Sequence, residues 1–405
     1  MFSIFCAQGQ TRDFFEDEPI RYSLATPLDP VARLAQQVAS GERQVQARST
    51  REFLIWLLDA LDISKHSQVL VFSKTSLQIG LISPKTPRAI YYNRDVYVGY
   101  VPGGVIEIAA MDPQLGAVFY EADFRNSARD EIFTRETKAC LSCHSGSRTE
   151  GVAGVFVRSV HAGADGHVLG NRAEFLSNDS LAIEHRWGGY YITGSGPDVL
   201  HIGNQLFSET NEPVPMDLWY KNLNSVIDTH HYLTPKADIL ALMLLEHQTR
   251  VHNVMTRASL QLRRKEFVDL AFEGVPGFSA NDGEEALERW VRDIVAVLTF
   301  ADEAKIGGDG MQGDEEVEMA LRKMAPVASS GRSLLDVRLH PRVMKQRCSY
   351  MIYSGMFRGL PDSLRLGVLQ RLRAVMAGKD PEFDHLGTKE RKRIDLILRE
   401  TVNDY

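Results

Sequence analysis

The chain has 405 residues and a formal net charge of −7, with 44% hydrophobic and 24% charged residues. This length allows two or three domains with substantial cores, and the composition is ordinary for a globular protein. The charges are spread along the chain, so no nucleic-acid partner is predicted. Residues 240–245 form an apolar run, but Glu246 and His247 close it. No transmembrane segment is therefore expected.

Residues 1–29 are expected to be an N-terminal tail or the remnant of an export signal. Residues 1–7 have a short apolar stretch and no basic region before it, so a signal would be truncated here. Cys6 would then be the last residue of the signal or a lipid-modified residue. Ile4 and Phe5 are bulky for a lipidation site, which disfavours the second reading.

Residues 30–130 are predicted to form a helical region followed by a β meander. The helical pattern covers 30–63, with Ser49 and Thr50 as a cap. Short β-branched or aromatic runs separated by Asn, Asp, Pro and Gly turns follow it. The predicted strands cover residues 69–72, 89–92, 96–101, 105–109 and 117–120.

The rest of the chain divides into a loop-rich segment, 131–233, and a helical region, 234–405. The loop-rich segment contains short strand patterns at 155–160 and 190–193. Thr234 as N-cap, Pro235 at the first helical position and Asp238 in the first turn predict a long helix that ends near residue 264. Further helices are predicted at 284–304 and 341–377, with a Gly-rich acidic break at 307–316. The predicted fold class is α+β.

The loop-rich segment contains Cys140-Leu141-Ser142-Cys143-His144, and C-x-x-C-H is the attachment sequence for a c-type haem. Two thiols at this spacing can each add to one vinyl group of a porphyrin. His144 then becomes the proximal iron ligand. The sequence thus predicts one covalently attached haem c per chain.

C-x-x-C is also typical of zinc sites and of redox-active dithiols. Half of a zinc site would need a second pair of ligands, but Cys6 and Cys348 are isolated. A thioredoxin-like dithiol remains open as an alternative. Cys348 itself, among Met and Tyr residues, is predicted to be a small buried hydrophobe.

A second strong protein ligand on the iron favours pure electron transfer, whereas an open sixth position permits chemistry at the iron. His247 falls in the middle of an apolar helix face, as an iron ligand or as a hydrogen-bonded core histidine. His201, in a glycine-rich loop, is the other candidate, with a loop-stabilising hydrogen bond as its alternative. His252 points away from the apolar face and is predicted to be a surface or boundary residue. Met216 is more simply a packing residue.

Arg186 and Trp187 are further cofactor-binding candidates, because Arg pairs with carboxylates and a Trp ring can cover a porphyrin edge. A cation–π or turn element is the alternative for this pair.

Several segments together resemble a family of large exported bacterial proteins described as cytochrome c domain-containing. The similarity extends from about residue 72 to the C-terminus and rests on residues 140–144, 186–191, 201–204, 245–248 and 349–354. The resemblance implies covalent haem c, export and electron transfer, and it carries over to Cys140, Cys143 and His144. Relatives have Met where this chain has Ile202, which argues against a thioether ligand there.

Two functions follow from these predictions. In the first, the protein is a monohaem c-type cytochrome in the periplasm, or otherwise exported, that passes electrons to or from a redox partner protein. In the alternative, the distal site is open and the protein is a peroxidase-like or oxygenase-like haem enzyme, with His201 or His247 as acid or base.

Overall fold

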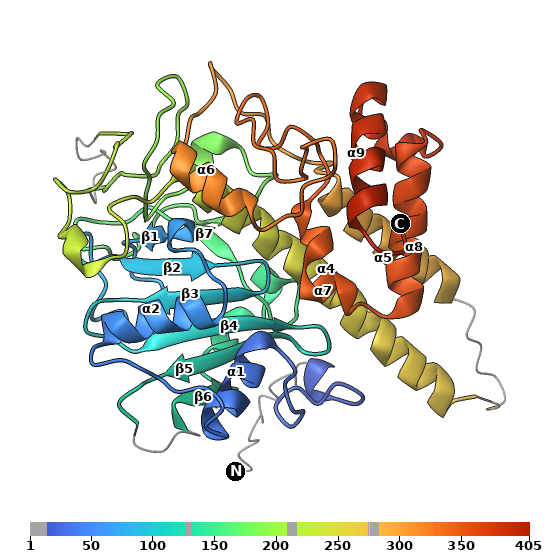
Figure 1. Ribbon diagram of the computed structural model, residues 1–405, viewed down its shortest axis with the longest axis horizontal. Coiled ribbons are helices and arrows are strands. Elements are labelled where there is room, and N and C mark those ends of the chain that lie inside the picture. The colour runs from blue at the N-terminus through green and yellow to red at the C-terminus, as the bar shows by residue number, and fades with distance from the viewer. Residues whose placement is uncertain (1–13, 127–130, 209–216, 274, 276–282) are drawn as a thin grey trace, which may run out of the picture.

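The structure is a computed structural model, and it describes residues 14–126, 131–208, 217–273, 275 and 283–405. An antiparallel sheet forms the centre of the N-terminal half and helices form the C-terminal half (Figure 1). The α+β class predicted from the sequence is therefore confirmed. The predictions for Cys6 and Met216 fall outside the described residues.

The main sheet has seven strands in the order β6-β5-β4-β3-β2-β1-β9, all paired antiparallel. They are β1 (Val69–Val71), β2 (Arg88–Tyr92), β3 (Val96–Tyr100), β4 (Ile106–Asp112), β5 (Gly116–Ala122), β6 (Phe133–Glu136) and β9 (Tyr190–Tyr191). The predicted meander is confirmed by β1 to β5. Because β9 pairs with β1, the loop-rich segment also supplies an edge strand. A second sheet pairs β7 (Val157–Ser159) with β8 (Phe175–Ser177).

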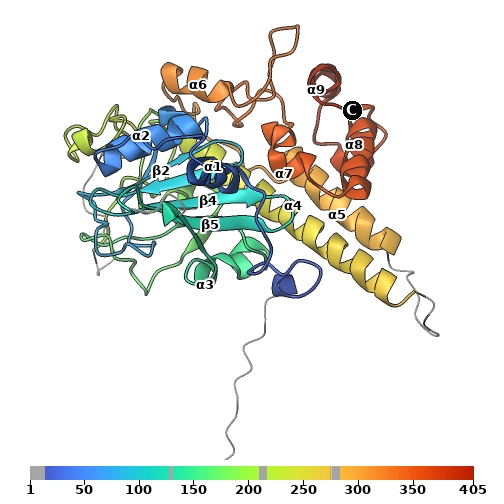
Figure 2. The same ribbon diagram turned by 60° about the horizontal axis from the view of Figure 1, so that its bottom comes forward.

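Helices α1 (Pro30–Ala39) and α2 (Thr50–Ala60) cover one face of the sheet (Figures 1 and 2). The single helical region predicted at 30–63 is thus two helices. Asp29 caps α1 by accepting hydrogen bonds from two backbone amides, and Ser49 caps α2 as predicted. The Tyr120 hydroxyl donates to Asp29 at 2.6 Å, which ties α1 to that face of β5.

The long helix α4 (Ile239–Ala271) begins with Asp238 as its N-cap, so the prediction of Thr234 as the cap is wrong. The carbonyl of Thr234 accepts a hydrogen bond from the Gln68 side chain, and the carbonyl of Pro235 accepts one from the Leu223 amide. These tertiary contacts hold the preceding residues outside the helix. Within the described part of the chain, no helix is both long enough and apolar enough to cross a membrane.

The other helices are α3 (Leu141–His144), α5 (Gly283–Leu298), α6 (Glu315–Arg322), α7 (Gly355–Arg358), α8 (Asp362–Met376) and α9 (Thr388–Thr401). Single 3₁₀ turns are found at Phe14–Glu16, Lys65–Ser67, Ser147–Thr149, Ile183–His185, Thr229–His231, Tyr350–Tyr353 and Pro381–Phe383. The helix predicted at 284–304 corresponds to α5. The one predicted at 341–377 is interrupted and contains α7 and α8.

Candidate haem-attachment site

The C-x-x-C-H motif forms α3, which lies on the face of the sheet opposite α1 and α2 (Figure 2). The His144 amide donates to the Cys140 carbonyl at 3.0 Å, so the five residues make one helical turn. Residues three and four apart share one face of a helix. The turn therefore presents Cys140, Cys143 and His144 on the same side.

The imidazole of His144 is held in one orientation. Its Nδ1 lies 2.9 Å from the carbonyl oxygen of Gly154, and its ring packs on Phe119 and Phe156 with centroid distances of 5.0 and 4.8 Å. A carbonyl oxygen only accepts hydrogen bonds, so Nδ1 carries the proton and Nε2 keeps its lone pair. Burial lowers the pKa of His144 to about 4, which keeps the ring neutral at neutral pH.

Cys140 and Cys143 are both free thiols, the first half-buried and the second exposed. Burial, with the nearby carboxylates Glu107, Glu136 and Glu121, raises the pKa of Cys140 to about 12. A zinc ligand or a redox-active thiol reacts as a thiolate, and burial disfavours that form at Cys140. An uncharged thioether has no such requirement.

A cavity of about 250 Å³ opens beside α3. Both cysteines and His144 line it, together with the facing side of the sheet, two residues of α4 and the segment 155–157. Its sheet and helix residues include Arg88, Ile90, Tyr97, Gly99, Glu107, Ala109, Phe119, Glu121, Tyr190, Leu245 and Thr249.

Small residues on two central strands make this space. Across the sheet, Tyr97 pairs with Ala109 and Ala109 pairs with Phe119, so a methyl group lies between two aromatic side chains. Tyr97 and Phe119 are on strands two spacings apart, which separates them by about 10 Å. Tyr97, Ala109, Phe119 and His144 all line the cavity.

One ion pair, between Arg88 and Glu107, lines the cavity. Arg88 Nη2 lies 2.6 Å from Glu107 Oε2, and both side chains are about one-fifth exposed, at 23% and 17%. Arg88 passes over Gly99, where an added Cβ would lie 2.3 Å from the guanidinium. Arg88 Nε is buried and has no hydrogen-bond partner among the described residues. This donor is suited to an acidic group entering the cavity, such as a porphyrin carboxylate.

His247 does not line this cavity. Its Nδ1 contacts Asp179 at 2.9 Å and its Nε2 contacts Ser349 at 2.6 Å, and the ring stacks on Phe300 with centroids 4.1 Å apart. Both nitrogens are therefore engaged. These contacts support the structural role that the sequence left open, and they leave no lone pair for iron.

Arg186 and Trp187 do not line the cavity. Arg186 is 2% exposed and pairs with the fully buried Glu246 at 3.3 Å, while its other nitrogens donate to two backbone carbonyls. Trp187 is fully buried and packs on His201, with centroids 5.2 Å apart. Glu246 directly follows Leu245, an α4 residue that lines the cavity.

His201 is also buried away from the cavity, between the rings of Trp187 and Trp219. Neither of its ring nitrogens has a hydrogen bond of normal geometry within the described residues, although the Gly203 backbone has a raising effect on its pKa. Burial outweighs that effect and lowers the pKa of His201 to about 4. The structure thus does not bring His201 to His144.

The sequence prediction for His252 is wrong, because this residue is fully buried. Its Nδ1 lies 2.8 Å from the hydroxyl of Tyr97, which lines the cavity. The helical periodicity missed this contact because the first half of α4 is buried on all sides. Cys348 is fully buried, as predicted.

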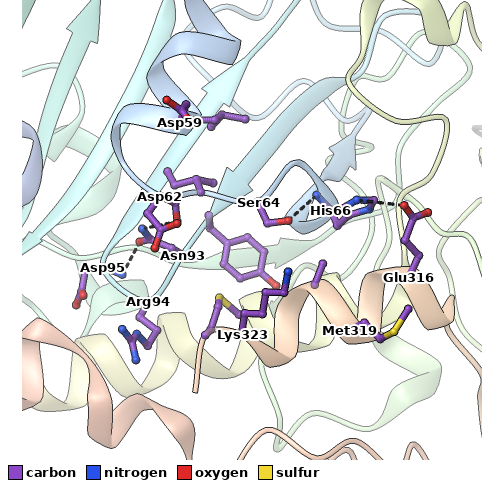
Figure 3. Close-up of a pocket in the computed structure, with 15 residues that line it drawn as sticks. Asp59, Asp62, Ser64, His66, Asn93, Arg94, Asp95, Glu316, Met319 and Lys323 are labelled. Carbon is purple, nitrogen blue, oxygen red and sulfur yellow. Dashed lines mark hydrogen bonds and ion pairs between the residues drawn. The ribbon is translucent and has the colours of Figure 1, made fainter. Parts of the chain in front are cut away.

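A larger hollow of about 660 Å³ lies elsewhere, between the end of α2, the β2–β3 turn and α6 (Figure 3). Its walls carry both acidic and basic side chains, among them Asp59, Arg94 and Lys323. His66 Nε2 lies 3.6 Å from Glu316 Oε1. No residue of the C-x-x-C-H motif lines it. Among the residues that the structure describes, no cluster of three or more His, Cys, Asp or Glu is arranged to hold a metal ion.

Sequence reasoning therefore found the motif but missed the cavity residues on the strands. The strand pattern includes Tyr97 and Glu107 only as parts of predicted strands, and it assigns Arg88 no role. The available signal was the small pair Gly99 and Ala109 in strands otherwise rich in large side chains. Comparison of the chain with protein-family models, curated proteins and solved structures gives no match.

Proposed function

We propose that this protein is a monohaem c-type cytochrome, with haem bound through thioethers to Cys140 and Cys143. His144 is the proximal ligand in this proposal. The observation that carries it is the contact between His144 Nδ1 and the Gly154 carbonyl, in a turn whose two thiols line the same cavity. Metal-bound histidines characteristically donate their second ring nitrogen to such a partner.

The haem supplies one-electron redox chemistry when bound, and the protein residues set its surroundings. The Gly154 carbonyl holds His144 with Nε2 unprotonated, the nitrogen that would bind the iron, and Phe119 and Phe156 pack against the imidazole. Arg88 is placed to pair with a carboxylate of the porphyrin. Cys143 is exposed and Leu77, which also lines the cavity, is 57% exposed. These residues favour a haem edge at the surface, where a redox partner protein can exchange electrons.

Covalent attachment at C-x-x-C-H takes place on the exported side of a bacterial membrane in the family that the chain resembles. A periplasmic or otherwise exported location is part of the same proposal.

The test is expression of the full chain behind an export signal in a bacterium that assembles c-type cytochromes. The wild-type protein should give a haem-stained band in a denaturing gel, and Cys140→Ser with Cys143→Ser should give none. Cys348→Ser is the matched control and should keep the stain, because that thiol is buried outside the motif. A stained band in the double variant would refute covalent attachment at this motif.

A further inference from the structure

The cavity beside α3 extends across one face of the main sheet. Residues of β5, β4, β3, β2 and β9 line it, in the order in which the sheet arranges these strands. The motif lies at the β6 and β5 side, where the Ala139 amide donates to Glu136 Oε2 at 2.8 Å and His144 packs on Phe119. Three strand spacings, about 14 Å, separate β5 from β2, which is comparable to the breadth of a porphyrin. A ring attached at the motif can therefore reach β2 with its opposite edge.

Arg88 and Tyr190 face the end of the cavity away from the motif. Val71 on β1 pairs with Arg88 on one side and with Tyr190 on the other. Residues directly opposite one another on paired strands have their side chains on the same face of the sheet. Both Arg88 and Tyr190 line the cavity. The two side chains therefore enter this end of the cavity from one row of the sheet.

The Tyr190 hydroxyl has a proton to donate. Burial raises the pKa of Tyr190, and the charge of Glu246 adds to this effect, so the phenol is protonated. The Arg158 backbone amide also lowers this pKa, as a donor to the phenol oxygen does, and so it leaves the O–H free. Both carboxylate oxygens of Glu246 are engaged by other side chains. Within the described part of the chain, the Tyr190 O–H has no hydrogen-bond acceptor.

Arg88 also has donors left over. Its Nη2 pairs with Glu107 Oε2 at 2.6 Å, and its Nε has no partner among the described residues. A guanidinium carries five N–H groups in a planar fork, more than this one contact uses. Hydrogen bonds from a cation to a carboxylate are among the strong ones. A free phenol and a partly free guanidinium, both facing one end of a cavity, are suited to a carboxylate.

We infer that Arg88 and Tyr190 together bind one carboxylate of the porphyrin, at the end of the cavity away from Cys140 and Cys143. The inference rests on the proposed haem. In haem, the vinyl groups that react with thiols and the carboxylates lie on opposite edges of the ring, which matches the separation of the motif from this site. The site determines which edge of the ring faces β2 and β9. It also reduces the negative charge that the carboxylate presents to the iron.

The test is resonance Raman spectroscopy of the full-length, haem-loaded protein, which detects a carboxylate deformation mode whose wavenumber rises with hydrogen bonding. Tyr190→Phe should move this mode to lower wavenumber. It should also lower the reduction potential, because more negative charge near the iron favours the ferric form. Arg88→Lys keeps the charge but loses the fork, and it should move the mode in the same direction.

Tyr97→Phe is the matched control. Tyr97 lines the same cavity, but its hydroxyl is engaged with His252 and Gln248, so the mode should stay in place.

The outcomes separate the two proposals. A protein without covalent haem contradicts the proposed function, and this inference with it. A haem-loaded protein whose mode is unchanged in both Tyr190→Phe and Arg88→Lys keeps the proposed function and overturns the carboxylate site. A shift in only one of these variants removes the other residue from the site. An equal shift in Tyr97→Phe also overturns the assignment. If Tyr190→Phe yields no folded protein, an unchanged mode in Arg88→Lys overturns the site.

Discussion

The imidazoles of half-buried His144 and buried His247 lie in contrasting surroundings. Each ring nitrogen of His247 has a hydrogen-bond partner. The buried Arg186 and Glu246 side chains are likewise paired with each other. Among the described residues, His144 has one hydrogen-bond partner, and it borders a cavity lined by two free thiols and by Arg88, whose Nε is unpaired there. Complete pairing is typical of a structural network, whereas groups left open around a space are typical of a binding site.

The largest effect on stability should come from opening the closed network. Glu246→Gln leaves Arg186 buried without a counter-charge, so the free energy of unfolding should fall by about 3–5 kcal/mol. Glu107→Gln is the matched control at the cavity. Because its pair with Arg88 is partly exposed, the loss there should be at most about 1 kcal/mol. Urea unfolding of the two variants measures both, and equal losses would break the comparison.

A smaller effect is expected from Asp179, whose carboxylate contacts His247 and Arg250. These partners hold its pKa below the usual range. The stabilisation is therefore present above the ordinary pKa of Asp, about 3.9, and is lost as the pH falls further. Asp179→Asn should lower the free energy of unfolding by about 1.5–3 kcal/mol at pH 7. The loss is limited because Arg250 still pairs with Asp302 and His247 still hydrogen-bonds Ser349.

Thermal unfolding of wild type and Asp179→Asn between pH 7 and pH 3 checks this sign. The two midpoints should converge as the pH falls. Midpoints that diverge in acid would show that the carboxylate is not stabilised in the folded state.

The smallest effect on stability is expected from filling the cavity. Ala109→Leu adds apolar atoms to the space beside His144, so stability should change by less than about 1 kcal/mol. Haem content per chain, measured by absorbance, should fall. Ala110→Leu is the matched control, because Ala110 is buried on the other face of the same strand. It should cost about 1–3 kcal/mol by overpacking and leave the haem content of the folded protein unchanged. An unchanged haem content in Ala109→Leu would show that the cavity is not part of the haem site.

Local patterns predicted the parts of this molecule that local physics determines. The alternating runs located strands β1 to β5, and Ser49 located the start of α2. The start of α4 was not predictable, because Gln68 and Leu223 bind the carbonyls that precede it. These residues are far away in sequence.

The same limit applies to the histidines. Helical spacing placed His247 inside and His252 outside, but both are buried because packing surrounds the first half of α4. His252 is the one that contacts a cavity-lining residue, Tyr97, which lies on a strand 155 positions away in the sequence. A pairing of that kind is set by tertiary packing, and the sequence carries no local sign of it.

The most direct test of the central claim is mass spectrometry of the proteolytic peptide that contains Cys140, Cys143 and His144, from protein exported by a bacterium that assembles c-type cytochromes. We predict a peptide whose mass is increased by one haem, with neither thiol open to alkylation. An unmodified peptide with two alkylated cysteines, from cells that attach haem to a control cytochrome, would contradict it.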